Sequence, residues 1–118
     1  MSTLNVSNIT DGTTTVGTSY VVNGSAKAYS AQQGDGTLLG GLNITSVTDL
    51  GTGSNQVNVA NSFANTNYAV LATGTTNSNA TIAMFQTILV GSFKINTRNA
   101  DKTSFDAATR SACFGDLA

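Results

Sequence analysis

The feature that most constrains the fold is an alternation of apolar and polar residues with a period of two. It occurs in Leu4-Asn5-Val6, Leu42-Asn43-Ile44, Val57-Asn58-Val59 and Phe93-Lys94-Ile95-Asn96. Successive side chains of an extended strand point to opposite faces of a sheet, so this pattern gives one apolar and one polar face. Further strands are predicted at residues 19–22, 26–29, 69–73, 81–85 and 111–114, where β-branched and aromatic residues are frequent.

Turn signals separate these segments. Asp11-Gly12 and Asn23-Gly24 favour tight turns because both pairs tolerate a positive φ. Helix is predicted only as one or two turns within residues 104–110. The fold class predicted is all-β, a single antiparallel β-sandwich of jelly-roll type over residues 19–118. Further breaks between strands are predicted at Gly34-Asp35-Gly36, Gly40-Gly41, Gly51-Thr52-Gly53 and Asn77-Ser78-Asn79.

Residues 1–18 are predicted to form an extended N-terminal arm. The large apolar residues of this segment after Met1 are Leu4, Val6, Ile9 and Val16, which are too few to bury one another. We therefore expect the arm to pack against another subunit or another protein, with Leu4, Val6 and Ile9 as its candidate anchor. Residues 4–13 also resemble residues 42–52, which predicts two similar strand-turn units.

The candidate core of the body consists of residues on the apolar side of alternating segments or in apolar runs between turns. We expect them to pack between two sheets or at a trimer axis. The single cysteine, Cys113, is predicted to be a small buried hydrophobic residue. The candidate core residues are Val57, Val59, Phe63, Tyr68, Val70, Phe93, Ile95 and Phe114.

The composition argues against an enzyme. The 118 residues include no His, Glu, Trp or Pro, and charged residues are 9% of the chain, against roughly a quarter in an average domain. Ordinary hydrolytic catalysis needs a His or paired carboxylates to carry a proton. The six acidic residues are all Asp without the spacing of a calcium loop, and Asp11, Asp35 and Asp49 are predicted to form turns. No catalytic residue, cofactor or metal site is expected.

The charge and the polar composition also restrict the partners. The formal net charge is −1 and the basic residues are scattered, so nucleic acid is not an expected partner. The longest apolar stretch, residues 80–90, is short of the roughly 20 residues that span a membrane, so no membrane insertion is expected. The many Ser, Thr, Asn and Gln side chains suit either hydrogen bonding to sugars, with Tyr20, Tyr29 or Tyr68 stacking on a sugar ring, or simply a neutral surface that resists proteases.

Several segments occur in an order that points to a known class of protein. They are Leu4-Asn5-Val6-Ser7-Asn8-Ile9-Thr10-Asp11-Gly12, Tyr20-Val21-Val22-Asn23-Gly24-Ser25-Ala26-Lys27-Ala28, Gly34-Asp35-Gly36-Thr37, Leu42-Asn43-Ile44-Thr45-Ser46-Val47-Thr48-Asp49, Asn67-Tyr68-Ala69-Val70 and Phe114-Gly115-Asp116-Leu117-Ala118. In this order the chain resembles the small tail-fibre-like virion proteins of marine bacteriophages of the cyanophage type. Where those proteins have Trp followed by an alternating strand, this chain has Tyr29-Ser30-Ala31-Gln32-Gln33. The resemblance implies a β-rich homotrimer without catalytic residues on the virion surface, made in the host cytoplasm.

The first function that we expect is a non-enzymatic structural protein of a phage virion. It would be an external trimeric fibre or knob, a tail fibre or a head fibre, whose partners are its own copies, other virion proteins and a host surface glycan. Three copies on one axis would strengthen a weak contact by roughly 10² to 10⁴. The alternative is a capsid decoration, or cement, protein that stabilises the shell with its arm. A remote alternative, suggested by Thr13-Thr14-Thr15, is ice binding.

Overall fold

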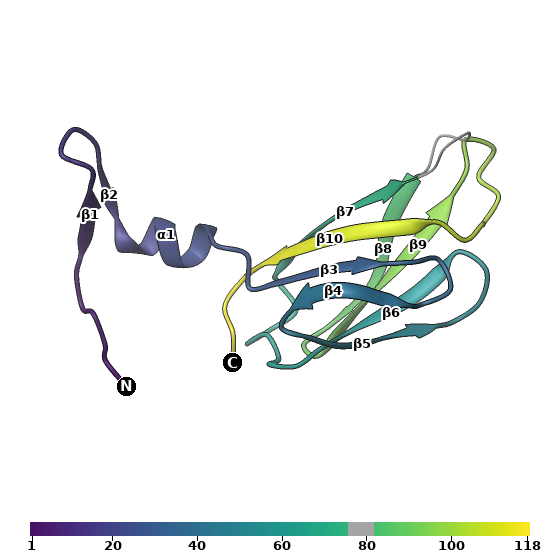
Figure 1. Ribbon diagram of the computed structural model, residues 1–118, viewed down its shortest axis with the longest axis horizontal. Coiled ribbons are helices and arrows are strands. Elements are labelled where there is room, and N and C mark those ends of the chain that lie inside the picture. The colour runs from purple at the N-terminus through teal and green to yellow at the C-terminus, as the bar shows by residue number, and fades with distance from the viewer. Residues whose placement is uncertain (76–81) are drawn as a thin grey trace.

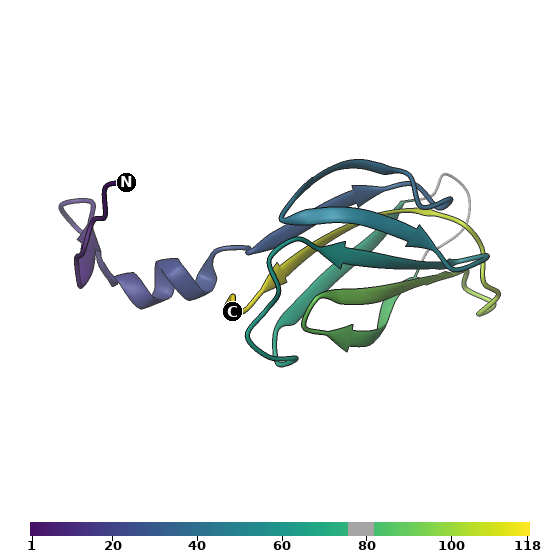
Figure 2. The same cartoon turned by 90° about the horizontal axis from the view of Figure 1, so that it is seen from below.

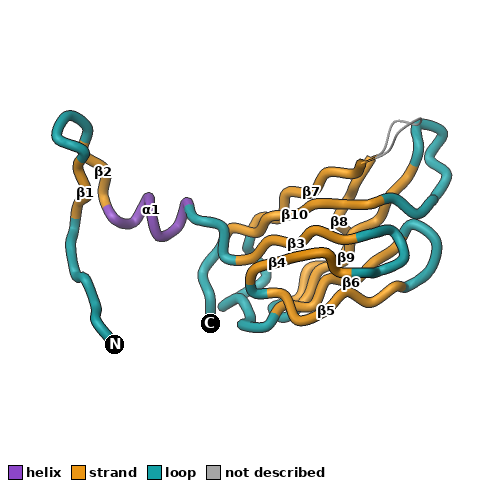
Figure 3. The backbone as a smooth tube through the Cα atoms, viewed as in Figure 1, coloured by secondary structure: helices purple, strands orange, loops and turns teal. Residues whose placement is uncertain are grey.

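The structure, a computed structural model, describes residues 1–75 and 82–118. In this part of the chain the fold is all-β apart from one short helix (Figure 3). The elements in chain order are β1 (Asn8–Thr10), β2 (Thr15–Gly17), α1 (Thr18–Gly24), β3 (Ala28–Gln32), β4 (Leu38–Leu42), β5 (Ile44–Asp49), β6 (Ser54–Val59), β7 (Ala69–Thr75), β8 (Ile82–Leu89), β9 (Ser92–Arg98) and β10 (Ala108–Phe114).

Two four-stranded antiparallel sheets form the body of the protein (Figure 1). Their strand orders are β4-β3-β10-β7 and β5-β6-β9-β8. One buried cluster contains residues of both sheets, including Val70 and Cys113 of the first and Val57 and Phe93 of the second. The core therefore lies between the inner faces of the two sheets, which Figure 2 shows from below.

Seven of the eight candidate core residues belong to this cluster: Val57, Val59, Phe63, Tyr68, Val70, Phe93 and Ile95. Phe114 differs from the expectation. It follows Cys113 in β10, and neighbouring residues of a strand point to opposite faces. Because Cys113 is fully buried, Phe114 points to the outer face of its sheet, where it is half-buried.

The interior is polar where it approaches the loops that lie far from the chain termini. The buried side chains there come from both sheets and include Ser30, Gln32, Asn55 and Thr109. The hydroxyls of Ser30 and Ser111 lie 2.7 Å apart, and the Asn55 side-chain amide donates to the Gly34 carbonyl at 3.1 Å. These hydrogen bonds replace only part of what the groups lose to water, because Gln32 Nε2, Asn55 Oδ1 and Thr109 Oγ1 are buried without a partner.

The predicted strand Leu42-Asn43-Ile44 is wrong, because the chain leaves one sheet and enters the other at Asn43. This residue has a positive φ of 56°, a conformation that Asn tolerates better than most residues. The Asn43 side chain holds the crossing in place. Its oxygen accepts from the Asn61 backbone N–H at 2.7 Å, and its nitrogen donates to the Asn61 carbonyl at 3.1 Å.

The strand predicted at residues 19–22 is also wrong, since this segment and the predicted turn Asn23-Gly24 lie in α1. Hydrogen bonds fix both ends of the helix. The Thr18 N–H donates to the Ser7 carbonyl at 2.9 Å, and the Lys27 ammonium group donates to the Val22 carbonyl in the last turn. A cation at a helix C-terminus is favourable because the carbonyl dipoles point to it. These contacts prevail over the low helix propensity of Val21 and Val22.

Three further predictions differ from the structure. The helix within residues 104–110 is absent: Ser104 forms an isolated β-bridge with Arg98, and β10 begins at Ala108. Gly40-Gly41 lies inside β4 and does not break it. The segment 4–6 lies outside the strands. The predicted break at residues 77–79 and the first residue of the predicted strand 81–85 lie outside the described residues.

The predicted turns at Asp11, Asp35 and Asp49 are confirmed. A side-chain oxygen of each accepts a hydrogen bond from a backbone N–H two residues later, at 2.8–2.9 Å. These bonds stabilise the carboxylate and hold the pKa of Asp11 and Asp35 below its usual range. The two similar strand-turn units are also confirmed, because β1–β2 and β5–β6 are both antiparallel hairpins.

The N-terminal segment lies apart from the two sheets (Figure 1). Residues 1–15 are exposed throughout, and α1 contains no buried residue. The first strand of the body, β3, begins at Ala28. The division into an arm of residues 1–18 and a body of residues 19–118 stays a prediction. We use "arm" below for residues 1–24, which comprise the segment before the strands, the β1–β2 hairpin and α1.

Candidate functional site

The two outer faces of the body differ in chemistry. In β6, Val57 points into the core, so its neighbours Gln56 and Asn58 point outward. In β9 the same alternation around Ile95 places Lys94 and Asn96 on the same outer face. We call this surface the amide face; its hydrogen-bonding residues are Ser46, Thr48, Gln56, Asn58, Gln86 and Asn96.

Hydrogen bonds between side chains order the amide face. The Asn58 amide donates to the hydroxyls of Ser46 and Thr48, both at 3.0 Å. The Gln56 amide donates to the Asn58 oxygen at 2.8 Å, which links the two residues along β6. Each bond restricts rotamers before any ligand arrives, so less conformational entropy is lost when the face binds a partner.

A second pair extends the same face toward β8. The Asn96 amide donates to the Gln86 side-chain oxygen at 2.8 Å. An amide group has two N–H donors and an oxygen with two lone pairs, so one bond per group leaves capacity for a ligand. Lys94, which pairs with Gln56 in the β6–β9 register, supplies one cation, and Arg98 at the end of β9 supplies a second on the same side of the strand. The face therefore presents donors and acceptors with little charge.

The outer face of the other sheet is apolar. One row of the register crosses all four strands, from Leu42 through Tyr29 and Ala112 to Leu71. Leu42, Tyr29 and Leu71 are each about half exposed or more, at 51%, 48% and 63%. Arg110 is the only charged residue in these four strands. We call this surface the apolar face.

The three tyrosines that were candidates for sugar stacking lie in different environments. Tyr68 is buried against Phe63, and its hydroxyl donates to the carbonyls of Leu89 and Ser92 at 2.7 and 3.1 Å. Burial raises its pKa to about 12. Tyr68 is therefore a core residue that cannot reach a sugar. Tyr20 lies on α1 and Tyr29 on the apolar face, and both are exposed.

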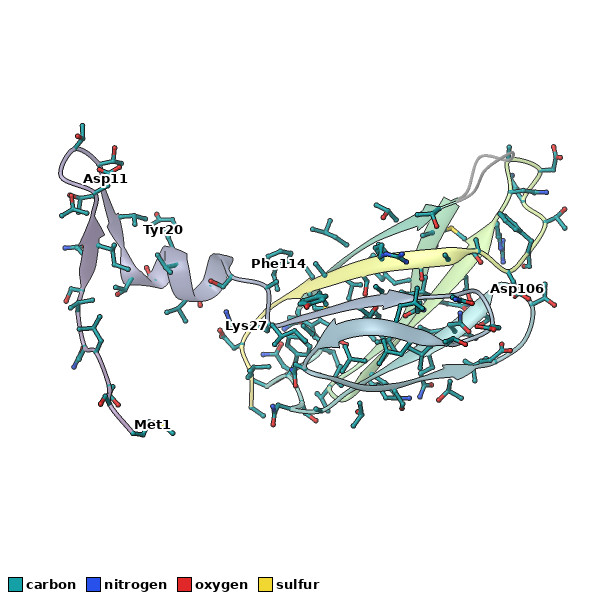
Figure 4. The ribbon with its side chains drawn as sticks, in the orientation of Figure 1. Met1, Asp11, Tyr20, Lys27, Asp106 and Phe114 are labelled. Carbon is teal, nitrogen blue, oxygen red and sulfur yellow. The ribbon has the colours of Figure 1, made fainter. Side chains whose placement is uncertain are left out.

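The candidate anchor residues do not contact the body and lie uncovered on the arm. Leu4 is 84% exposed, and Val6 and Ile9 are also exposed. Sequence reasoning names Tyr20 as a candidate for sugar stacking but misses the exposed Val22 of α1, because residues 19–22 are predicted to form a strand. The signal that could have located it is Lys27, a cation placed to bind the last carbonyls of a short helix. Tyr20 is labelled in Figure 4.

The single thiol is confirmed as a buried hydrophobic group. Cys113 is free and fully buried, and burial raises its pKa to about 12. At neutral pH it is a protonated thiol, which is a poor nucleophile. The Thr residues that suggested ice binding lie at the end of the β1–β2 hairpin, where Thr13 and Thr14 turn the chain and do not form flat ranks.

Neither a metal centre nor a membrane helix is found in the described part of the chain. Residues 1–75 and 82–118 contain no group of three or more Cys and Asp side chains that could hold a metal ion. None of the helical residues described there forms a helix long and apolar enough to cross a bilayer. No protein-family model matches the chain, and no curated protein or solved structure matches it.

Proposed function

We propose that this chain is a non-enzymatic structural protein of a bacteriophage virion. It acts as an external trimeric fibre or knob on the tail or capsid and contacts glycans of the host surface through the amide face. The observation that carries this proposal is the ordered set of amides and hydroxyls across β5, β6, β9 and β8. The phage assignment itself comes from the resemblance of the sequence.

A glycan suits the amide face for two reasons. Sugar hydroxyls both donate and accept hydrogen bonds, and the side chains of the face offer both functions. The strands of this face carry two cations on their outer side, Lys94 and Arg98, so a neutral or weakly anionic saccharide is favoured over a nucleic acid, whose binding needs several phosphate contacts. One such exposed contact is weak, and three copies on one axis raise the avidity by roughly 10² to 10⁴.

The finer architecture that we propose is a β-sandwich, supported by the single core cluster shared by the two sheets. Three of the connections are hairpins within one sheet, namely β3–β4, β5–β6 and β8–β9. Two sheets joined by hairpins and by crossings make a sandwich of general antiparallel type. The jelly-roll type of sandwich stays a prediction. The three hairpins within single sheets do not favour it.

The binding test compares a variant of the amide face with a control variant outside it. The double variant Gln56→Leu/Asn58→Leu removes the centre of the amide network, and Thr66→Val, which changes one exposed hydroxyl in the loop before β7, is the control. Immobilised lipopolysaccharide from marine cyanobacteria is the probe. Two hydrogen bonds at about 1 kcal/mol each predict a loss of at least about tenfold in affinity for the double variant. Equal binding by all three proteins contradicts the proposal.

The absence of catalysis is tested with the same probe. Glycoside hydrolysis ordinarily needs a pair of Asp or Glu side chains, and the carboxyl side chains of this chain are six Asp scattered along the sequence. We expect mass spectrometry of the polysaccharide to show the same chain lengths before and after incubation. Released fragments would show that the protein is a depolymerase.

A capsid decoration protein is the second candidate, and the uncovered arm favours it. Leu4, Val6 and Ile9 need a surface that the body of the same chain does not supply. A cement protein would use this segment to bind neighbouring capsomers. Adding the purified protein to particles that lack it separates the two functions. A rise in the temperature of genome release indicates cement, whereas a gain in host adsorption alone indicates a fibre.

A further inference from the structure

We propose that the arm of one copy docks on the apolar face of a second copy, so that the subunits of the oligomer exchange their arms. This inference rests on the trimer of the proposed function and identifies the contact that holds it together. Three observations support it. The arm has no core of its own, the apolar face of the body is uncovered, and the arm and that face carry opposite charges.

The arm is too small to be stable by itself. Its hairpin pairs Ile9 with Val16 across two three-residue strands, and no third strand covers them. A two-stranded hairpin alone is marginally stable in water. Helix α1 has seven residues, none of them buried, and isolated helices of this length do not persist. Burial of Ile9, Val16 and the exposed Tyr20 on a surface would stabilise both elements.

The apolar face offers such a surface. Leu42, Tyr29, Ala112 and Leu71 form a continuous row across the sheet, so a hairpin or a short helix can lie along it. Burying apolar area contributes about 25 cal/mol per Å². The amide face of the other sheet has no comparable row, because hydrogen-bonded polar side chains occupy its centre.

The charges select the arm as the occupant. Asp11 is the only charged side chain within residues 1–24, and Arg110 is the only charged residue in β3, β4, β7 and β10. Both are exposed. Docking the arm brings opposite charges to one interface. Packing two apolar faces against each other would instead give Arg110 no acidic partner, because β3, β4, β7 and β10 contain no Asp or Glu.

The geometry favours the arm of another copy over the chain's own arm. Only residues 25–27 separate α1 from β3, and the Lys27 N–H is bonded to the Cys113 carbonyl at 2.8 Å. From this point α1 leads away from the sheets (Figures 1 and 2), and the labelled Asp11 lies at the far end of the arm (Figure 4). Folding back onto the same apolar face would require a reversal within three residues.

A disulfide trap tests the contact in the full-length chain. Ile9→Cys is placed in one preparation and Leu71→Cys in another, and the two are mixed under mild oxidation. The native Cys113 is fully buried and does not compete. We expect a two-chain disulfide between the two variants. No mixed product, or a closed single-chain product in the double variant Ile9→Cys/Leu71→Cys, would overturn the inference.

Charge exchange tests the same contact without cross-linking. We expect Arg110→Glu to raise the concentration at which the oligomer half-dissociates by about tenfold, because an attraction becomes a repulsion. The double variant Asp11→Lys/Arg110→Glu should restore assembly, and Lys94→Glu on the amide face is the matched control. Light scattering gives the mass of each variant.

The outcomes separate this inference from the proposed function. Trimers that persist in Arg110→Glu and after deletion of residues 1–24 would overturn arm exchange while leaving the trimeric fibre intact. A wild-type protein that is monomeric at micromolar concentration would overturn both. Loss of assembly in Arg110→Glu with recovery in the double variant supports arm exchange, whatever the result of the glycan test.

Discussion

The ring of Tyr68 stacks on the ring of Phe63, with 3.9 Å between centroids and 11° between the planes. The Tyr68 hydroxyl reaches past this stack and donates to the carbonyls of Leu89 and Ser92, which flank the turn between β8 and β9. Tyr68 lies just before β7 in one sheet, whereas β8 and β9 belong to the other. One side chain therefore links the two sheets by both packing and hydrogen bonds.

The variant Tyr68→Phe separates these two contributions. The ring stack remains, whereas the carbonyls of Leu89 and Ser92 lose a donor. Unsatisfied polar groups in a protein interior cost about 1–3 kcal/mol. We expect the melting temperature to fall by several degrees, measured by circular dichroism. Thr66→Val, which removes an exposed hydroxyl in the loop before β7, is the control, and an equal loss of stability in both variants would show that the hydroxyl of Tyr68 contributes nothing special.

The two phenylalanines that the sequence placed together in the core should respond differently to truncation. Phe93 is 1% exposed, and replacing a buried Phe with Ala costs about 3–5 kcal/mol. Phe114 is half-buried on the outer face, so we expect Phe114→Ala to cost about 1 kcal/mol. Urea unfolding measures both. A Phe114→Ala variant as damaged as Phe93→Ala would show that Phe114 is a core residue after all.

The alternation in the sequence located the strands of the body and most of the core because it continues over several residues in β6 and β9. It failed at Phe114 because the run Ala112-Cys113-Phe114 is apolar on both faces of β10. The alternation also failed at Leu42 and Ile44, whose spacing fits a single strand. The hydrogen bonds that divide this segment join Asn43 to Asn61, which is 18 residues away in the sequence. Contacts between residues so far apart produce no periodic pattern in the sequence.

The amide face could be predicted in part. The polar positions Gln56, Asn58 and Asn96 follow directly from the alternation with Val57 and Ile95. Which side chains bond to one another depends on strand register. That register is set by bulges, between Ile44 and Ser46 and between Phe85 and Ile88. A bulge shifts one strand against the next and has no clear signal in a single sequence.

Two glycines should respond in opposite ways to substitution by Ala. Gly53 has a φ of +68°, and a Cβ there would lie 2.6 Å from the Thr97 carbonyl oxygen. Gly40, inside β4, has no atom within 4 Å of a Cβ position. We expect Gly53→Ala to lower the free energy of unfolding by more than about 1 kcal/mol, and Gly40→Ala to leave it unchanged or raise it by about 0.5 kcal/mol. Urea unfolding midpoints measure both, and a destabilised Gly40→Ala would show that this site is covered in solution.

The stability of the body should decrease in alkaline solution. Burial raises the pKa of Cys113 from 9.0 and of Tyr68 from 10.0, each to about 12 in the folded protein. The folded state therefore holds these protons more tightly than the unfolded state, so the stabilisation is complete below pH 9 and is lost as the pH rises toward 12. In Cys113→Ala we expect the decline in melting temperature to begin near pH 10. A decline that still begins near pH 9 would show that Cys113 is not its cause.

The arm should be dispensable for folding of the body and required for assembly. None of residues 1–15 and none of α1 is buried, so deletion of residues 1–24 removes no side chain from the core. The first bond between this region and the sheets, from Lys27 N–H to the Cys113 carbonyl, remains in the truncated chain. We expect circular dichroism of the truncated protein to show an intact β-spectrum, with a melting temperature within a few degrees of that of the full-length protein. The truncated protein should fail to enter virions when it replaces the wild-type copy during infection, and deletion of residues 1–18 alone should have the same effect.

If either truncated protein unfolds, the arm completes the core and the boundary that the sequence suggested is wrong. If both enter virions normally, the body binds the particle without its arm, and Leu4, Val6 and Ile9 are not an anchor.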